Sequence, residues 1–486
     1  MSDTAYPSVN DLTLEEKASL TSGGDAWHLQ GVESKGIPGY MITDGPHGLR
    51  KSLASSTGET DLNDSVPATC FPPAAGLSSS WNPELIHKVG EAMAEECIQE
   101  KVAVILGPGV NIKRNPLGGR CFEYWSEDPY LAGHEAVGIV AGVQSKGVGT
   151  SLKHFAANNQ ETDRLRISAN ISQRALREIY FPAFEHIVKT AQPWTIMCSY
   201  NRINGVHSAQ NHWLLTDVLR DEWGFEGIVM SDWGADHDRV ASLNAGLNLE
   251  MPPSYTDDQI VYAARDGRIQ PEQLDRMAQG MVDLVNKTRA AMSVENYRFD
   301  VDAHDEVAHQ AAVESMVLLK NDDDILPVAA NAKIAVIGEF ARTPRYQGGG
   351  SSHITPTKMT SFLDTLAERG ANATSAPRSH RASPSTSNRP TPSSKPKPSK
   401  PPKTPTSSSC SSAFRKPPNP KASTVKPSTF QPSRSNCSKP SPPKTRTSSW
   451  CCPTDPSSPW HHGRATPRAS SNPGCLARRA VRRSPT

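Results

Sequence analysis

The sequence of 486 residues lacks several features that would place it in common functional classes. It has no run of about 18 apolar residues, so no segment is predicted to span a membrane. Its start, MSDTAYPSVNDLTLEEK, has no basic segment followed by an apolar stretch, which predicts no secretory signal and a cytoplasmic protein. The HExxH spacing is also absent, so we predict no metal, and the absence of GxGxxG and GxxxxGK[ST] predicts no phosphate-binding loop.

Cysteine is sparse in the first 375 residues and shows no regular spacing. The four cysteines there lie far apart and form no CxxC pair. This pattern favours reduced thiols over a disulfide framework or a zinc site. The four residues are Cys70, Cys97, Cys121 and Cys198.

Residues 376–486 have almost no aliphatic and almost no acidic side chains. Val425, Leu476 and Val481 alone represent the Val/Leu/Ile/Met set, and Asp455 stands against 21 Lys and Arg. The same stretch holds 23 of the 41 prolines and no glutamate. Such a segment cannot bury enough apolar area to offset its ordering entropy, so we predict a disordered tail. It carries a net charge of +20, against −18 for residues 1–375.

Short apolar runs alternate with longer amphipathic stretches in residues 1–296. The runs predict strands and the stretches predict helices, while residues 61–77 are predicted to be a long loop. This alternation predicts an α/β domain, and its length suits a (β/α)8 TIM-like barrel. The predicted strands are Tyr40–Thr43, Val102–Leu106, Thr195–Ser199, Ile228–Ser231 and Leu247–Met251, and the predicted helices are Pro83–Lys101, Ser172–Thr190, Trp213–Trp223 and Gln273–Arg289.

A second unit is predicted in residues 297–375. Val307–Leu319 and Met359–Arg369 have helical patterns, and Lys333–Gly338 (KIAVIG) has the pattern of a buried strand. A further strand is expected after Gly370–Ala371–Asn372, but the composition changes within a few residues. The interrupted sheet predicts uncovered strand edges and apolar faces, and hence aggregation.

Polar side chains cluster where the predicted strands end. Asp44 follows YMIT, Lys153 and His154 follow Gly149–Leu152, and Asp232 follows IVMS. In a parallel α/β barrel, residues at the carboxyl ends of the strands face the active site. With Tyr200 and Trp233, which also follow strands, this inventory suits a polyhydroxylated ligand whose ring can lie against an aromatic face.

Six motifs, in order, make residues 13–375 resemble a glycoside hydrolase family 3 enzyme of the bacterial and fungal β-glucosidase type. The resemblance implies a (β/α)8-like barrel followed by an α/β sandwich domain, and an enzyme that needs no cofactor. The motifs are MITDGPHGLR (41–50), LGPGVNIKRNPLGGRCFEYWSEDP (106–129), SLKHFAANNQETDR (151–164), CSYNRINGVHSAQN (198–211), GFEGIVMSDWGAD (224–236) and VLLKNDDDILP (317–327).

The resemblance also implies roles for single residues. Asp232 matches the family's nucleophile, which forms a covalent glycosyl–enzyme and gives hydrolysis with retention. Nearby cations are expected to keep this carboxylate ionised. Asp44 matches the carboxylate that binds the far hydroxyls of the sugar, and Ser351 is chosen over Ser352 as the residue of the GGGSS loop that reaches the same subsite. The remaining expected substrate-binding residues are Arg50, Arg120, Lys153, His154, Arg164, Tyr200 and Trp233.

The resemblance places the general acid/base of this branch on a glutamate of the second domain, beyond residue 375. No glutamate follows Glu368 in the sequence. We therefore expect a truncated second domain without its proton donor, and low or no activity. The abrupt change to Ser/Pro/Lys/Arg-rich sequence at residue 376 resembles a reading-frame slip in GC-rich coding DNA.

Other interpretations of these residues remain open. Asp232 could cap a helix, Tyr200 and Trp233 could be core aromatics, and Arg164 could pair with the neighbouring Asp163. The alternative function is that of a catalytically dead sugar-binding remnant whose basic tail binds polyanions. We expect an oligosaccharide or glycoside partner and no specific nucleic acid or membrane, and the sequence leaves the sugar, the linkage and the oligomeric state open.

Overall fold

The computed structural model describes residues 6–54, 60–329, 332–369 and 373–375. The chain divides into two units, residues 1–391 and 392–486, and every described residue belongs to the first. The predicted disordered tail, 376–486, lies outside the described residues. None of the described helices is both long and apolar enough to cross a bilayer.

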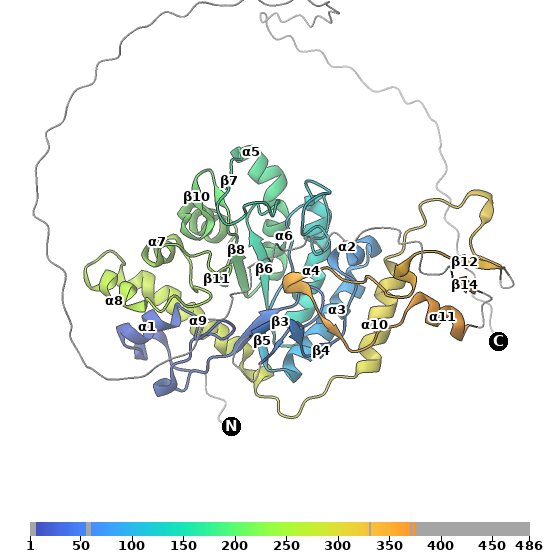
Figure 1. The fold of residues 1–486 in the computed structure, drawn as a ribbon. Helices are drawn as coiled ribbons and strands as arrows, with labels where there is room; N and C mark the ends of the chain where they lie inside the picture. The colour runs from blue at the N-terminus through green and yellow to red at the C-terminus, as the bar shows by residue number, and fades with distance from the viewer. Residues whose placement is uncertain (1–5, 55–59, 330–331, 370–372, 376–486) are drawn as a thin grey trace, which may run out of the picture. The chain divides into compact units, whose positions relative to one another are not determined.

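A five-stranded parallel sheet lies at the centre of the first unit, in the order β1-β5-β6-β8-β11. Figure 1 shows β6, β8 and β11 side by side. The three strands β5, β8 and β11 are buried along their whole length, as is typical of parallel strands covered on both faces. The bounds are Met41–Asp44 for β1, Val102–Leu106 for β5, Gly149–Phe155 for β6, Thr195–Cys198 for β8 and Ile228–Ser231 for β11.

Helices follow the strands, and several begin with side-chain caps. Asn82 precedes Pro83, the first residue of α3, and its side chain accepts a hydrogen bond from the Leu85 amide. Asp128 caps α4 with its side chain in the same way. α3, α4 and α6 pack in sequence, and α9 contacts β5 and β11. The α-helices are α1 Leu14–Leu20, α2 Ala74–Leu77, α3 Pro83–Gln99, α4 Pro129–Ser145, α5 Gln173–Ala175, α6 Pro182–Ala191, α7 Arg239–Ala245, α8 Asp257–Arg265, α9 Pro271–Met292, α10 Val301–Glu314 and α11 Phe362–Glu368.

Shorter elements complete the unit. β10-β9-β7 form a small three-stranded sheet, while β2 pairs with β3, β4 with β13 and β12 with β14. The bounds are β2 Ser52–Ala54, β3 Thr60–Ser65, β4 Pro67–Ala68, β7 Ser168–Ala169, β9 Arg202–Ile203, β10 Val206–His207, β12 Ile334–Val336, β13 Thr355–Pro356 and β14 Ala373–Ser375. Two segments are π-helical, η4 Leu176–Tyr180 and η6 Trp213–Glu222, and the 3-10 turns are η1 Val9–Asp11, η2 Glu33–Lys35, η3 Ser78–Ser80, η5 Ser208–Gln210, η7 Asp322–Asp324, η8 Glu339–Ala341 and η9 Gly350–Ser352.

The α/β class is confirmed, but an eight-stranded sheet is not seen in the described part of the chain. Leu247–Met251, predicted as a strand, forms only isolated pairings. Leu249 exchanges backbone hydrogen bonds with β11, and Glu250 turns to Thr21 at 3.0 Å. The partner changes within one residue, so no regular strand develops.

Two further sequence predictions need correction. The predicted helix Ser172–Thr190 is broken before Pro182, which has no amide hydrogen to continue the helical ladder. Residues 61–77 are not a plain loop, because they contain most of β3 and all of β4 and α2. β4 pairs with β13, almost 290 residues away, and local sequence carries no signal of such a partner.

The segment after α9 contains the predicted helices and strand, but the strand is more exposed than predicted. The helix predicted at Val307–Leu319 is present as α10, but α10 begins and ends before the predicted bounds. The predicted strand KIAVIG contains β12. A strand does follow residue 372, because β14 pairs in parallel with β12. However, β12 is only partly buried and Ile337 is 73% exposed, so the predicted buried strand is wrong in its burial.

Candidate active site

A pocket of about 490 Å³ lies at the carboxyl ends of the central strands. Asp44 ends β1, Lys153 and His154 lie in the last part of β6, Tyr200 follows β8, and Asp232 follows β11 directly. Lys153 and His154 are therefore within their strand rather than after it. The sequence-predicted residues that line this pocket are Asp44, Arg120, Lys153, His154, Arg164, Tyr200, Asp232, Trp233 and Ser351.

Asp232 is a buried carboxylate in the wall of this pocket. Its Oδ1 accepts a hydrogen bond from the Trp233 amide at 2.8 Å, which fixes the orientation of the carboxylate. Burial raises the pKa of Asp232, while Arg120, Lys153 and hydrogen bonds from Trp233 and Tyr200 lower it. The net direction is upward, while the cations favour the ionised carboxylate, as expected. The cations oppose the effect of burial without overcoming it.

Asp44 is held between two cations. Arg50 Nη1 lies 3.3 Å from Asp44 Oδ2, and Lys153 Nζ lies 3.7 Å from Asp44 Oδ1. Burial nevertheless raises the pKa of Asp44 above its usual range. Arg50 is buried and is not among the residues that line the pocket, and it reaches the pocket through its pair with Asp44.

His154 is held from three sides. Asn111 exchanges hydrogen bonds with its backbone, and the Tyr124 hydroxyl lies 3.1 Å from His154 Nδ1. Its Nε2 lies 3.7 Å from Asp232 Oδ2. Burial, with Arg120, Lys153 and Arg164 nearby, lowers the pKa of His154 well below its usual value. A Tyr124 hydroxyl that donates to Nδ1 leaves the Nε2 hydrogen directed at Asp232.

Two carboxylates that the sequence analysis did not select also line the pocket. Glu123 pairs with Arg120, and Glu161 pairs with Arg164. The expected partner Asp163 instead pairs with Arg166 at 2.6 Å. Burial raises the pKa of Glu123, but Arg120, Lys153 and His47 together outweigh it and the net pKa is lowered. Both glutamates lie within the motifs given above, three residues from the arginine that each one pairs with. This spacing could have predicted the two ion pairs.

Aromatic residues from distant segments form one side of the pocket. The rings of Trp27 and Trp233 lie 5.3 Å apart, and the Trp233 indole donates to the Ala26 carbonyl at 2.9 Å. Trp27 was not predicted, because its partner lies 206 positions away in the chain. Arg164 lies over the Tyr200 ring at 5.0 Å.

The GGGSS loop reaches the same pocket through its serine and two glycines. Gly349, Gly350 and Ser351 line the pocket, whereas Ser352 is buried and donates to the Gly349 carbonyl at 3.0 Å. A Cβ at Gly348 would lie 2.3 Å from the Phe122 ring, so only glycine permits this approach.

Two family profiles match the sequence of this chain. Residues 51–284 match the profile "Glycosyl hydrolase family 3 N terminal domain", and residues 316–444 match "Glycosyl hydrolase family 3 C-terminal domain". The chain belongs to glycoside hydrolase family 3. The second match runs past Ser375, where the resemblance was predicted to end, into residues that the structure does not describe.

Several family 3 proteins are similar to this chain. The exo-alpha-(1->6)-L-arabinopyranosidase of Bifidobacterium longum is 89% identical over 386 residues, which cover 78% of this chain and 51% of that protein. Thermostable beta-glucosidase B of Acetivibrio thermocellus is 52% identical over 366 residues, covering 75% of this chain and 48% of that protein. The chain thus spans about half the length of the curated relatives it matches.

Solved structures show the same family likeness. The GH3 beta-glucosidase of Bifidobacterium adolescentis is 91% identical, with a TM-score of 0.73, over 77% of this chain and 53% of that one. Beta-glucosidase 3B of Thermotoga neapolitana, solved in complex with glucose, is 39% identical, with a TM-score of 0.70, over 75% and 54% of the two chains.

Proposed function

We propose that this chain is a retaining glycosidase of the β-glucosidase type, in which Asp232 attacks the anomeric carbon of a terminal pyranosyl residue. The observation that carries the proposal is the buried, oriented Asp232 carboxylate in a pocket lined by hydrogen-bonding side chains and two tryptophans. Attack by a carboxylate oxygen would form a covalent glycosyl–enzyme, and water would then release the sugar with retention. The central sheet would be the main part of the family's barrel.

The other pocket groups fit the recognition of a sugar ring. Asp44, fixed by Arg50 and Lys153, would accept hydrogen bonds from hydroxyls far from the anomeric carbon. Neutral His154 would donate from Nε2 and hold the carboxylate without forming a competing ion pair. Trp27 and Trp233 would supply apolar faces at the open side of the pocket. Arg120, Arg164, Tyr200 and Ser351 would complete the polar wall.

This chain is expected to protonate the leaving group poorly, for want of a suitable general acid. The Glu123 carboxylate is held ionised by Arg120, so we propose that it does not serve as the acid. A retaining mechanism needs a second carboxyl group about 5–5.5 Å from the first. The resemblance places this group on a glutamate beyond residue 375, and no glutamate follows Glu368, so we propose that these 486 residues lack the family's acid. Turnover of unactivated disaccharides should then be low or absent.

An activated aryl glycoside tests the nucleophile without an acid, because a good leaving group departs with little protonation. We expect 2,4-dinitrophenyl β-D-glucopyranoside to give a burst of one phenolate per chain. D232N should slow this burst by at least on the order of a thousandfold. The matched control D258N removes an exposed carboxylate of α8 and should leave the burst unchanged. An equal burst from D232N would overturn the proposal.

The pH dependence of this burst provides a second criterion. Attack requires the ionised carboxylate, and burial raises the pKa of Asp232. The burst rate should therefore fall on acidification at a higher pH than an ordinary aspartate, near 3.9, would give. Comparing 2,4-dinitrophenyl β-D-glucopyranoside with the α-L-arabinopyranoside would establish the sugar, since the relatives differ in this respect.

The alternative proposal is a sugar-binding remnant that has lost catalysis. The absence of glutamate after residue 368 favours it. Binding of D-glucose without any phenolate burst would support the remnant, and a burst would exclude it. Sequencing the coding DNA across codons 365–385 would show whether a frame slip created the tail.

A further inference from the structure

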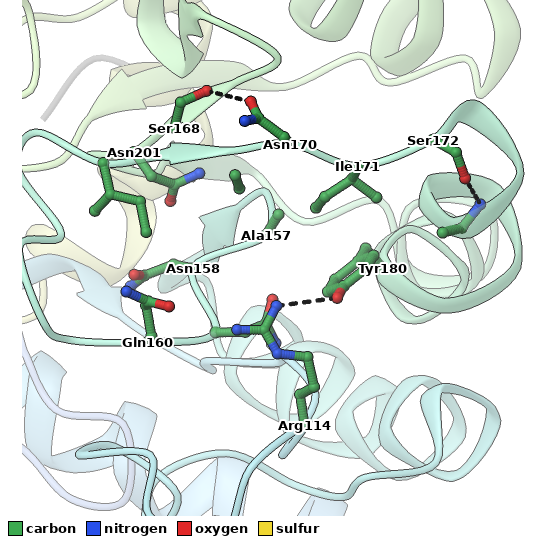
Figure 2. A pocket seen from close by; sticks show the side chains of 14 residues that line it. Arg114, Ala157, Asn158, Gln160, Ser168, Asn170, Ile171, Ser172, Tyr180 and Asn201 are labelled. Carbon is green, nitrogen blue, oxygen red and sulfur yellow. Dashed lines mark hydrogen bonds between the residues drawn. The ribbon is translucent and has the colours of Figure 1, made fainter. Parts of the chain in front are cut away.

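The loop that brings Ser351 to the Asp232 pocket belongs to residues 347–356, which follow β12 in the chain. Ser351 and two glycines of this segment line that pocket. Figure 2 shows another pocket, of about 400 Å³, whose lining residues all lie between Arg114 and Asn201. The segment therefore completes one particular pocket, and contacts with the earlier part of the chain must fix its position.

Ile354 is buried where its neighbours in the chain are exposed. Among the described residues after α10, it is the only apolar side chain in the hydrophobic core, and it is 0% exposed. Leu319 and Ile337, in contrast, are 91% and 73% exposed. All other members of the core that receives Ile354 lie in α10 or before it. Burial of an isoleucine side chain is favourable, so Ile354 holds its segment against that core.

The side chain of Ile354 packs against the turn that joins Asp44 to Arg50. Gly48 lies in this turn with a φ of +146°, and a Cβ at this position would lie 2.6 Å from Ile354 Cδ1. Only glycine permits so close an approach. The Arg50 amide donates to the Asp44 carbonyl at 2.9 Å and closes the turn. Ile354 thus contacts an element that belongs to the Asp232 pocket.

The backbone of Ile354 is bonded to the residue that precedes the GGGSS loop. Its amide donates to Gln347 Oε1 at 2.8 Å, and its carbonyl accepts from Gln347 Nε2 at 2.9 Å. These two hydrogen bonds close residues 347–354 into a ring that contains the whole GGGSS loop. Directly after Ile354, β13 pairs with β4. A displacement of Ile354 must therefore be passed on to Ser351.

We propose that Ile354 is a positioning residue, which holds the GGGSS loop at the pocket and thereby sets the affinity of the site for its sugar. Ile354 is not among the residues that line the pocket, so it acts through Ser351 and the two glycines. This proposal rests on the proposed function, because it concerns the ligand affinity of the same pocket. Asp232 follows β11 and His154 lies in β6, so loss of the anchor should weaken binding and leave the attacking group in place.

Calorimetric titration of the full 486-residue chain with D-glucose measures this affinity without any chemistry. We expect I354A to raise the Kd by at least about tenfold, because a small displacement of a positioning group has effects of this order. I354V keeps most of the side-chain volume and should restore the Kd to within about threefold of wild type. The matched control I260A removes the same atoms from an equally buried isoleucine of α8, which belongs to a separate hydrophobic cluster, and should leave the Kd unchanged.

A double-mutant cycle with Ser351 distinguishes positioning from a general loss of stability. S351A removes only the hydroxyl and should weaken D-glucose binding in the wild-type background. In the I354A background the loop has already left the pocket, so S351A should have no further effect. With 2,4-dinitrophenyl β-D-glucopyranoside, I354A should raise the half-saturating concentration of the burst and leave its limiting rate within about threefold of wild type.

Hydrogen exchange of residues 347–357, followed by mass spectrometry, tests the anchor without a ligand. These amides should exchange faster in I354A than in wild type or I260A. If I354A does not melt cooperatively, Q347A replaces it, because this variant breaks both hydrogen bonds to Ile354.

The proposal is wrong if a folded I354A or Q347A binds D-glucose as tightly as wild type does. It is also wrong if S351A weakens binding by the same factor in both backgrounds. Binding of D-glucose without a phenolate burst would instead count against Asp232 as the nucleophile, and the comparison of the Kd values would still decide the role of Ile354.

Discussion

The strands β5 (Val102–Leu106) and β12 (Ile334–Val336) have similar apolar sequences but different surroundings. β5 pairs with β1 on one side and β6 on the other, and all five of its residues are buried. Among the strands that the structure describes, β12 pairs only with β14, and its residues are half-buried or exposed. The difference shows that a parallel strand becomes a core strand only when neighbours cover its edges and both its faces.

Exposed apolar side chains also lie in the segment that leads from α10 to β12. Met316, Leu319 and Ile325 are 74%, 91% and 70% exposed, whereas comparable residues before residue 296 are mostly buried. Single exposed apolar residues are ordinary, but a concentration of them marks a surface that is prone to association. The predicted aggregation therefore has a defined location in the segment after α10.

The largest expected effect comes from removing side-chain volume in the covered strand. Ile105 is 1% exposed in β5, so I105A should leave a cavity that the surrounding helices cannot close. The expected loss of unfolding free energy is about 2–5 kcal/mol. Urea denaturation followed by tryptophan fluorescence measures it. A loss below 0.5 kcal/mol would mean that β5 is not a core strand.

An intermediate loss of unfolding free energy is expected where α10, which precedes β12, contacts α3, which precedes β5. His304 of α10 places Nδ1 3.0 Å from Glu96 and Nε2 3.2 Å from Glu95, both on α3. Burial lowers the pKa of His304, but the hydrogen bonds with Glu96 and Glu95 outweigh it and the net pKa is raised. A raised histidine pKa stabilises the fold below the unfolded value of about 6.5, and this contribution disappears as pH rises through the folded pKa.

H304Q keeps an amide donor but removes the titration. We expect it to cost about 1.5–3 kcal/mol at pH 6, the range for hydrogen bonds to charged groups. The difference between wild type and H304Q should shrink steadily toward pH 9. Denaturation midpoints of both chains across this range provide the measurement, and a difference independent of pH would exclude the His304 switch.

The sequence allowed much of the fold and pocket to be predicted, because the decisive signals were local. Asp44 and Asp232 stand where apolar runs end, and the end of a parallel strand is where such residues meet. The pairing of Arg50 with Asp44 was not predictable, since local sequence does not say which carboxylate an arginine meets. Trp27, Glu123 and the β4–β13 pairing depend on partners that only the folded chain brings together.

The smallest expected effect sharpens the comparison with β5. Ile337 directly follows β12 and is 73% exposed, so little apolar area is lost to water when it is replaced. We expect I337S to change the unfolding free energy by less than about 0.5 kcal/mol, as for most surface substitutions. Because the same replacement removes exposed apolar surface, light scattering of concentrated I337S should be lower than that of wild type. A loss comparable to that of I105A would show that β12 is covered in solution, and the contrast between the two strands would then fail.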